Sequence, residues 1–127
     1  MAKTAAQLVA EAKASIDNLT PDQVAAEIEG GDVVIVDIRE PAERAAGYIP
    51  GSLAAPRGLL EFSADPTSPS HIPGLEPGRR VILHCAGGGR SALAVKTLQE
   101  MGYENVAHLD GGFNGWKAAG KPVEGGA

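Results

Sequence analysis

The residues best suited to chemistry lie in one short segment, Cys85 to Arg90, which contains the only cysteine of the chain. Its three consecutive glycines, Gly87 to Gly89, let the backbone adopt positive φ angles and turn N–H groups inward without side-chain obstruction. Arg90 adds a fixed positive charge, and its planar guanidinium suits a sulfonate, phosphate or carboxylate. A purely structural cysteine needs neither feature, so the segment predicts a reactive thiol beside an anion site.

The residues on either side of this segment indicate how it is held. Arg80 to His84 is a short, mostly apolar and β-branched run that is typical of a buried strand, and Ser91 to Met101 has apolar residues at helical spacing. A loop between such a strand and helix receives the free amide groups and the positive dipole end of the helix. An anionic ligand, or a thiolate at Cys85, would be stabilised there.

Three ordered blocks of residues carry a family resemblance. The blocks are Asp37 to Ser52 (DIREPAERAAGYIPGS), His84 to Ser91 (HCAGGGRS) and Asp110 to Trp116 (DGGFNGW). They resemble the D-x-R…E…G-H-I-P-G-A block, the active loop and the closing G-G-x-x-x-W of single-domain rhodaneses, sulfurtransferases that carry sulfane sulfur as a cysteine persulfide. The resemblance spans about Leu19 to Val123, and Arg44, Tyr48 and Ser52 depart from it at positions that look structural in the family.

The resemblance implies both a fold and a site. The expected fold is a three-layer α/β/α structure with a mostly parallel central sheet. Cys85 would be the nucleophile, and the active loop Ala86, Gly87, Gly88, Gly89 and Arg90 would surround the persulfide. Thiosulfate is the expected type of small anionic sulfur donor, and cyanide, a thiol or a protein is the expected acceptor, with no cofactor and no metal.

Loop length separates this chemistry from a related one. Phosphatases on a similar scaffold space the two residues as C-x5-R because a tetrahedral phosphate needs a wider ring of amides, whereas Cys85 and Arg90 are spaced as C-x4-R. The absence of a second cysteine also disfavours an arsenate reductase with an internal disulfide. Sulfur transfer therefore leads over a phosphatase or arsenate reductase, and a non-enzymatic persulfide carrier or sensor stays open.

Composition limits the class of protein further. A chain of 127 residues fits one domain, and 16 acidic against 11 basic residues give a net charge of −5, which argues against binding nucleic acid or anionic membranes. One cysteine leaves no disulfide and no CxxC metal or redox site. The first residues lack an uninterrupted apolar signal segment, and no apolar run has membrane-spanning length. The expectation is a cytoplasmic protein, either a monomer or a weak homodimer.

The chain divides into three predicted regions. Residues 1–17 contain an amphipathic helix over Thr4 to Ile16, which packs on its own domain or forms a dimer contact. Residues 18–123 form the rhodanese-like domain, and residues 124–127 are a tail, with fraying expected from Lys121 onward.

The domain itself shows strands alternating with helices. Thr20 and Pro21 are a helix start, and Gly30 and Gly31 an end. The predicted strands are Val33 to Ile38, Leu53 to Ala55, Arg80 to His84 and Asn105 to Leu109, and a short helix is predicted over Arg57 to Phe62. This alternation predicts an α/β fold with helices on both faces and the site at the carboxyl ends of the strands.

Several other side chains have two interpretations. Asp37, with Arg39 and Glu43 after it, is either a general base or a salt-bridged brace, and the brace is favoured because buried charges are usually paired. Arg57 either adds a second charge to the site or is a solvated surface arginine.

Three further features could have either a chemical or a structural role. Ser63 to Gly78 is an irregular segment that is a lid, a specificity element or a mobile connection. His71 within it could be a ligand or proton carrier, but an exposed loop histidine is expected. A Cys-His-Asp triad through His108 and Asp110 is disfavoured, since a thiolate activated by amides needs no base. Trp116 is expected in the core.

Overall fold

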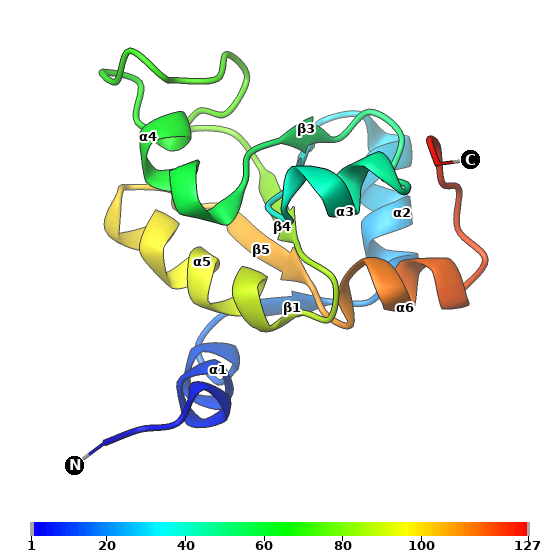
Figure 1. Cartoon of the computed structure of the whole chain (residues 1–127). Helices are drawn as coiled ribbons and strands as arrows, with labels where there is room; N and C mark the ends of the chain where they lie inside the picture. The colour runs from blue at the N-terminus through cyan, green and yellow to red at the C-terminus, as the bar shows by residue number, and fades with distance from the viewer. Residues whose placement is uncertain (1, 127) are drawn as a thin grey trace.

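The computed structural model describes residues 2–126, which form a five-stranded parallel sheet in the order β1-β5-β4-β2-β3 (Figure 1). The strands are β1 (Asp17–Leu19), β2 (Val34–Asp37), β3 (Leu53–Ala54), β4 (Val81–His84) and β5 (Val106–Leu109). The helices are α1 (Ala5–Lys13), α2 (Pro21–Gly30), α3 (Pro41–Ala45), the 3-10 turn η1 (Arg57–Leu59), α4 (Leu60–Ala64), α5 (Gly89–Glu100) and α6 (Gly112–Ala118). The predicted α/β class is confirmed.

The central strands are buried on both faces of the sheet, in keeping with their mostly apolar sequences. Val81 and Leu83 of β4 face a core shared with α4 and α5, whereas Ile82 faces a second core shared with α2 and α6. Figure 1 shows these two helix pairs on opposite sides of the sheet. Because β4 lies between β2 and β5, the residue that follows β4 emerges at the middle of the sheet.

The predicted start and end of α2 are confirmed. The Thr20 hydroxyl accepts from the Gln23 N–H, and the Gln23 side chain accepts from the Thr20 N–H, which is a capping box. Gly31 ends the helix in the left-handed conformation that glycine adopts without steric cost. Local sequence therefore determines both ends of this helix.

The N-terminal region differs in part from its prediction. Helix α1 packs against α5 of the same chain, and it ends at Lys13 rather than Ile16. Asn18 donates side-chain N–H bonds to the Lys13 and Ile16 carbonyls as the chain turns into β1. Strand β1 was not predicted, because its short and largely exposed sequence has no apolar pattern. It forms through its pairing with β5.

Two further segments differ from what the sequence predicted. Residues 41–45, for which no helix was predicted, form the short helix α3 with Pro41 at its first position. The helix expected to end at Phe62 continues to Ala64, so the irregular segment starts at Asp65 rather than Ser63. The Tyr103 hydroxyl lies 2.6 Å from the Ala64 carbonyl and 3.0 Å from the Leu75 carbonyl, which ties this segment to the body of the domain.

His71 was expected to be exposed, and that expectation is wrong. Its side chain is 17% exposed, and its Nε2 lies 3.0 Å from the Leu75 carbonyl oxygen. The imidazole therefore links two turns of the irregular segment.

The expectation of fraying from Lys121 is also wrong for the part of the tail that the structure describes. Tyr48 and Glu124 exchange two backbone hydrogen bonds of 2.8 and 2.9 Å. The Trp116 indole N–H donates to the Pro122 carbonyl, and Lys121 pairs with Asp22 of α2. Within residues 2–126, none of the helices combines the length and the apolar character needed to cross a membrane.

Candidate active site

Cys85 directly follows β4 and lies just before the N-terminus of α5. Helix α5 begins at Gly89, two residues earlier than the predicted start at Ser91, so Arg90 belongs to its first turn rather than to the loop. Gly88 precedes the helix with φ of 106°, a conformation that favours glycine. A Cβ at Gly88 would also lie 3.3 Å from the Gly111 nitrogen, which leaves little room for a side chain.

The sulfur of Cys85 is surrounded by hydrogen-bonding groups. Its Sγ accepts from the Gly88 N–H at 3.1 Å and from the Ser91 N–H at 3.4 Å, and it lies 3.5 Å from the Ser91 hydroxyl. The residue is only 1% exposed. Two inward amides at a helix N-terminus are suited to stabilising a thiolate.

The remaining amides of the predicted loop do not contact this sulfur. Within the described structure, the N–H groups of Ala86, Gly87, Gly89 and Arg90 make no hydrogen bond to Sγ, so the cup around the unmodified sulfur has two main-chain donors. Gly87 is exposed, whereas Gly88 and Ser91 are buried with Cys85.

Helix α6 holds the carbonyl side of the same loop. The Phe113 N–H donates to the Cys85 carbonyl at 2.8 Å, and the Asn114 N–H donates to the Ala86 carbonyl at 3.0 Å. Gly112, with φ of 60°, makes this approach possible, because a Cβ there would lie 2.5 Å from the Ala86 oxygen and 2.6 Å from the Cys85 oxygen.

Arg90 is paired with Glu43 of α3. Its two terminal nitrogens donate to the two Glu43 carboxylate oxygens at 2.8 and 3.0 Å, a bidentate contact. This contact with Arg90, together with the Glu40 backbone N–H, lowers the pKa of Glu43 to about 2. Arg90 therefore joins the first turn of α5 to α3.

Asp37 is buried at the end of β2 within a cluster of arginines. Arg39 contacts both of its carboxylate oxygens at 2.9 Å, and Arg44 adds a third guanidinium contact at 3.2 Å. Burial alone would raise the pKa of Asp37, but the hydrogen bonds from Arg39 and the neighbouring positive charges together outweigh it, so the pKa is lowered. These contacts have the geometry of a brace.

The three departures from the family motif contact one another. The Arg44 guanidinium lies over the Tyr48 ring at 4.4 Å and donates to the hydroxyl and the carbonyl of Ser52. The departures therefore form one packed unit that also reaches Asp37.

Arg57 lies between two helices. It pairs with Glu61 at 2.9 Å, and its other terminal nitrogen lies 3.4 Å from the Thr97 hydroxyl of α5. In the described structure this guanidinium makes no hydrogen bond or ion pair with the Cys85 loop.

A chain of buried polar side chains extends from the sulfur toward β1. The Ser91 hydroxyl lies 2.8 Å from His108 Nδ1, and His108 Nε2 lies 2.7 Å from the Asn18 side-chain oxygen. Asp110 pairs with Lys13, not with His108, so no Cys-His-Asp triad forms. Sequence reasoning missed Asn18 as a site residue and gave the Ser91 side chain no role, because only the fold brings the two side chains to His108.

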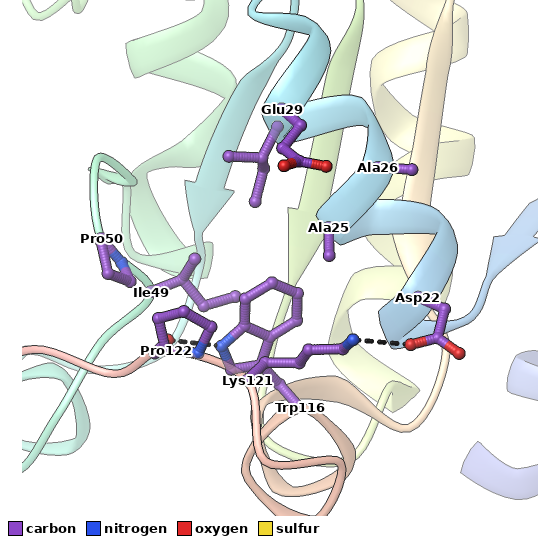
Figure 2. Close-up of a pocket in the computed structure, with 10 residues that line it drawn as sticks. Asp22, Ala25, Ala26, Glu29, Ile49, Pro50, Trp116, Lys121 and Pro122 are labelled. Carbon is purple, nitrogen blue, oxygen red and sulfur yellow. Dashed lines mark hydrogen bonds and ion pairs between the residues drawn. The ribbon is translucent and has the colours of Figure 1, made fainter.

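A pocket of about 490 Å³ lies elsewhere, between α2, α6 and the C-terminal segment (Figure 2). Trp116 lines it with the Lys121–Asp22 ion pair nearby, although the indole itself is 2% exposed and packs in the core as expected. Cys85 is not among its lining residues. Nor do three or more His, Cys, Asp or Glu side chains gather into a metal-binding group in residues 2–126.

This fold and this cysteine loop correspond to a known domain family. The model of the rhodanese-like domain matches residues 20–119, so the chain belongs to the rhodanese-like family, and the predicted resemblance is confirmed. A sulfurtransferase of Allochromatium vinosum is 39% identical over 108 residues, covering 85% of this chain and 92% of that protein. The thiosulfate sulfurtransferase GlpE of Pseudoalteromonas translucida is 38% identical and covers 69% and 76% respectively.

A solved structure extends the likeness to the N-terminal helix. A protein of unknown function from Rhodopseudomonas palustris, described as a possible tyrosine phosphatase, is 46% identical with a TM-score of 0.89. The match covers 98% of this chain and 96% of that protein.

Proposed function

We propose that this protein is a sulfurtransferase that moves sulfane sulfur from a small anionic donor such as thiosulfate to cyanide or a thiol through a persulfide on Cys85. The observation that carries the proposal is the Cys85 sulfur, which accepts two main-chain N–H bonds at the N-terminus of α5. Membership of the rhodanese-like family and the likeness to two sulfurtransferases support the same class of reaction.

The reaction has two half-reactions. First, the Cys85 thiolate attacks the outer sulfur of thiosulfate; a new S–S bond forms, the S–S bond of thiosulfate breaks, and sulfite leaves with the electron pair. Second, cyanide or a thiolate attacks the outer persulfide sulfur, and the Cys85 sulfur leaves with its electron pair. The N–H groups of Gly88 and Ser91 stabilise the negative sulfur at the beginning and the end of the cycle.

The outer sulfur of the persulfide would lie among the loop residues that do not contact Sγ itself. The amide groups of Ala86, Gly87 and Gly89 do not bond to Cys85 Sγ, and we propose that they stabilise the outer sulfur of the persulfide rather than the thiolate. Arg90 is assigned to shaping the loop, since Glu43 already occupies both of its terminal nitrogens. Asp37 and Arg39 brace the neighbouring strand end, with no role as a base.

The test is the intact mass of the protein after exposure to thiosulfate. Loading should add the mass of one sulfur atom, addition of cyanide should remove it, and Cys85→Ala should show no gain. Steady-state kinetics with both substrates should follow a ping-pong pattern. Wild-type protein that gains no sulfur from thiosulfate or from another sulfane donor would contradict the proposal.

A second candidate, a persulfide carrier or sensor, is favoured by the burial of Cys85. With 1% of the residue exposed, an acceptor reaches the sulfur only when neighbouring atoms move. A persulfide that forms but resists cyanide and small thiols, and passes its sulfur only to a protein, would identify a carrier.

A phosphatase is the third candidate, because the Rhodopseudomonas palustris protein is described as a possible one. The short C-x4-R spacing and the pairing of Arg90 with Glu43 oppose it, since the arginine is not free to hold a phosphate. Hydrolysis of para-nitrophenyl phosphate that depends on Cys85 would support this candidate over sulfur transfer.

A further inference from the structure

The Ser91 hydroxyl connects the sulfur of Cys85 with a buried histidine. Its oxygen lies 3.5 Å from Cys85 Sγ, 2.8 Å from His108 Nδ1 and 3.3 Å from the Gly88 carbonyl oxygen. Ser91 and His108 are fully buried, and Cys85 is nearly so. Bulk water is therefore excluded from the path that these three side chains form.

The directions of the hydrogen bonds follow from Asn18. Its side-chain nitrogen donates to the carbonyls of Lys13 at 2.9 Å and Ile16 at 3.2 Å, which leaves its oxygen facing His108. An amide oxygen only accepts, so the hydrogen of the neutral imidazole is on Nε2 and a lone pair is on Nδ1. Asn18 therefore selects the tautomer of His108.

This tautomer determines the hydrogen of Ser91. The single hydroxyl hydrogen of Ser91 goes to His108 Nδ1, the nearer of its two acceptors. The lone pairs of the Ser91 oxygen then face Cys85, and the thiol hydrogen points at them. The resting chain of donors runs from the Cys85 S–H to the Ser91 O–H to His108.

We propose that Ser91 and His108 form a proton relay that activates Cys85, a step that rests on the sulfur transfer proposed above. The S–H bond of Cys85 breaks as a new O–H bond forms at Ser91, and the former Ser91 hydrogen moves to His108 Nδ1. The products are a thiolate and an imidazolium whose Nε2–H still donates to Asn18. When an acceptor takes the outer sulfur and frees the Cys85 thiolate, the proton returns by the same path.

The charges around His108 suit an imidazole that carries the proton only transiently. Asp110 and Lys13 are the charged groups that act on it, and they pair with each other at 2.9 Å. Burial lowers the pKa of His108 to about 4, so the resting imidazole is neutral and its Nδ1 lone pair is available. It holds the proton only while an anionic sulfur, first the thiolate and then the outer sulfur of the persulfide, is present to offset the charge.

The test compares variants that separate basicity from hydrogen bonding. His108→Asn places an amide oxygen near the position of Nδ1; this oxygen still accepts from Ser91 but has no basic lone pair. We expect His108→Asn and Ser91→Ala to slow single-turnover sulfur loading about 100-fold at neutral pH, the low end of general acid–base effects. The deficit should shrink at alkaline pH, where solvent removes the thiol proton. His71→Asn is the matched control and should load at the wild-type rate.

Asn18→Ala provides a variant at an exposed position if the buried substitutions impair folding. It removes the partner of Nε2 and should slow sulfur loading at neutral pH by a smaller factor, about 3- to 10-fold, consistent with one lost hydrogen bond. This deficit should also shrink at alkaline pH. Loading by His108→Asn at the wild-type rate, or an equal deficit at every pH, would overturn the relay.

A second readout separates the relay from sulfur transfer. The rate at which methyl methanethiosulfonate modifies Cys85 reports thiolate formation without any sulfane donor. If wild-type protein reacts with this probe but does not load sulfur, the proposed function fails, and the ratio of wild-type to His108→Asn rates decides the relay alone. A wild-type thiol that neither loads sulfur nor reacts with the probe at neutral pH would overturn both.

Discussion

Gly112 shows how one residue can control the geometry of a loop more than twenty positions away in the chain. Its left-handed backbone brings the Phe113 and Asn114 amides onto the carbonyls of Cys85 and Ala86. With those carbonyls held by α6, the amides of Gly88 and Ser91 remain turned toward the sulfur. The glycine thus acts on the thiol through the backbone alone.

Gly112→Ala should therefore damage both stability and loading. The added Cβ would meet three atoms of the Cys85 and Ala86 carbonyl groups at 2.5 to 2.6 Å, on a residue with a left-handed φ. We expect a loss of about 2–4 kcal/mol in the free energy of unfolding, measured by urea denaturation, and sulfur loading should slow. Gly115→Ala, three residues on in the same helix, has no atom closer than 3.9 Å and should be neutral or slightly stabilising. Equal effects of the two substitutions would contradict this account.

Arg57 gives a separate test of the sulfur-donor site. If its charge draws an anionic donor, Arg57→Ala should raise the KM for thiosulfate several-fold and leave kcat nearly unchanged, because the lost attraction precedes chemistry. Arg79→Ala removes the same charge from an exposed position and serves as the control. Identical kinetics for the two variants would make Arg57 a structural partner of Glu61 and Thr97.

At the scale of elements, the Arg90–Glu43 contact joins α5 to α3. A brace of this kind predicts that Arg90→Ala and Glu43→Ala lower kcat/KM for thiosulfate by similar factors. The double variant should lose little more than either single one, because both single changes remove the same contact.

Direct binding of the sulfur donor by Arg90 predicts a different pattern. Arg90→Ala would then raise the KM for thiosulfate well beyond Glu43→Ala, and the losses would add in the double variant. Kinetics of the four proteins with thiosulfate and cyanide distinguish the two roles.

The sheet and the main loop could be predicted from sequence because their signals are local. Val33 to Val36 is continuously apolar, as is typical of a central parallel strand, and Thr20 marks a helix start by its own hydrogen bonds. The spacing of Cys85 and Arg90 is likewise visible in one short segment. Each of these features requires no knowledge of distant residues.

Other parts depend on contacts that only the fold creates. Strand β1 is polar and exposed, so nothing in its own sequence marks it; pairing with β5 makes it a strand. His108 is 17 residues from Ser91 and 90 from Asn18 in the chain, and the parallel register sets Asn18 opposite His108. No local pattern predicts such a line of side chains.

For the whole molecule, two buried histidines make stability depend on pH. Burial lowers the pKa of His84 to about 4 and that of His108 to about 4, against about 6.5 for an exposed histidine. Between these values the unfolded chain takes up protons that the folded chain does not. Stability should therefore be complete above about pH 6.5 and should fall as the pH drops toward 4.

Urea unfolding at a series of pH values measures this slope. His108→Asn should reduce it, and His71→Asn should leave it closer to wild type. Ionised Glu43 contributes to the free energy of unfolding in a lower pH range, because its pKa is lowered from 4.5 to about 2 in the folded protein. This contribution is lost only as the pH falls below about 4.5. A free energy of unfolding that is constant between pH 4 and 6.5 would contradict the burial of neutral imidazoles.

Strand β1 ends at Leu19, one residue before the stretch by which relatives of this protein are recognised. Asn18 therefore belongs to the surroundings of the sulfur without belonging to the segment shared across the family. A version of the chain cut to the shared segment would keep every signature residue and still lose the group that orients His108. Reactivity in this protein would then be adjusted at an edge of the sheet that the family motifs do not include.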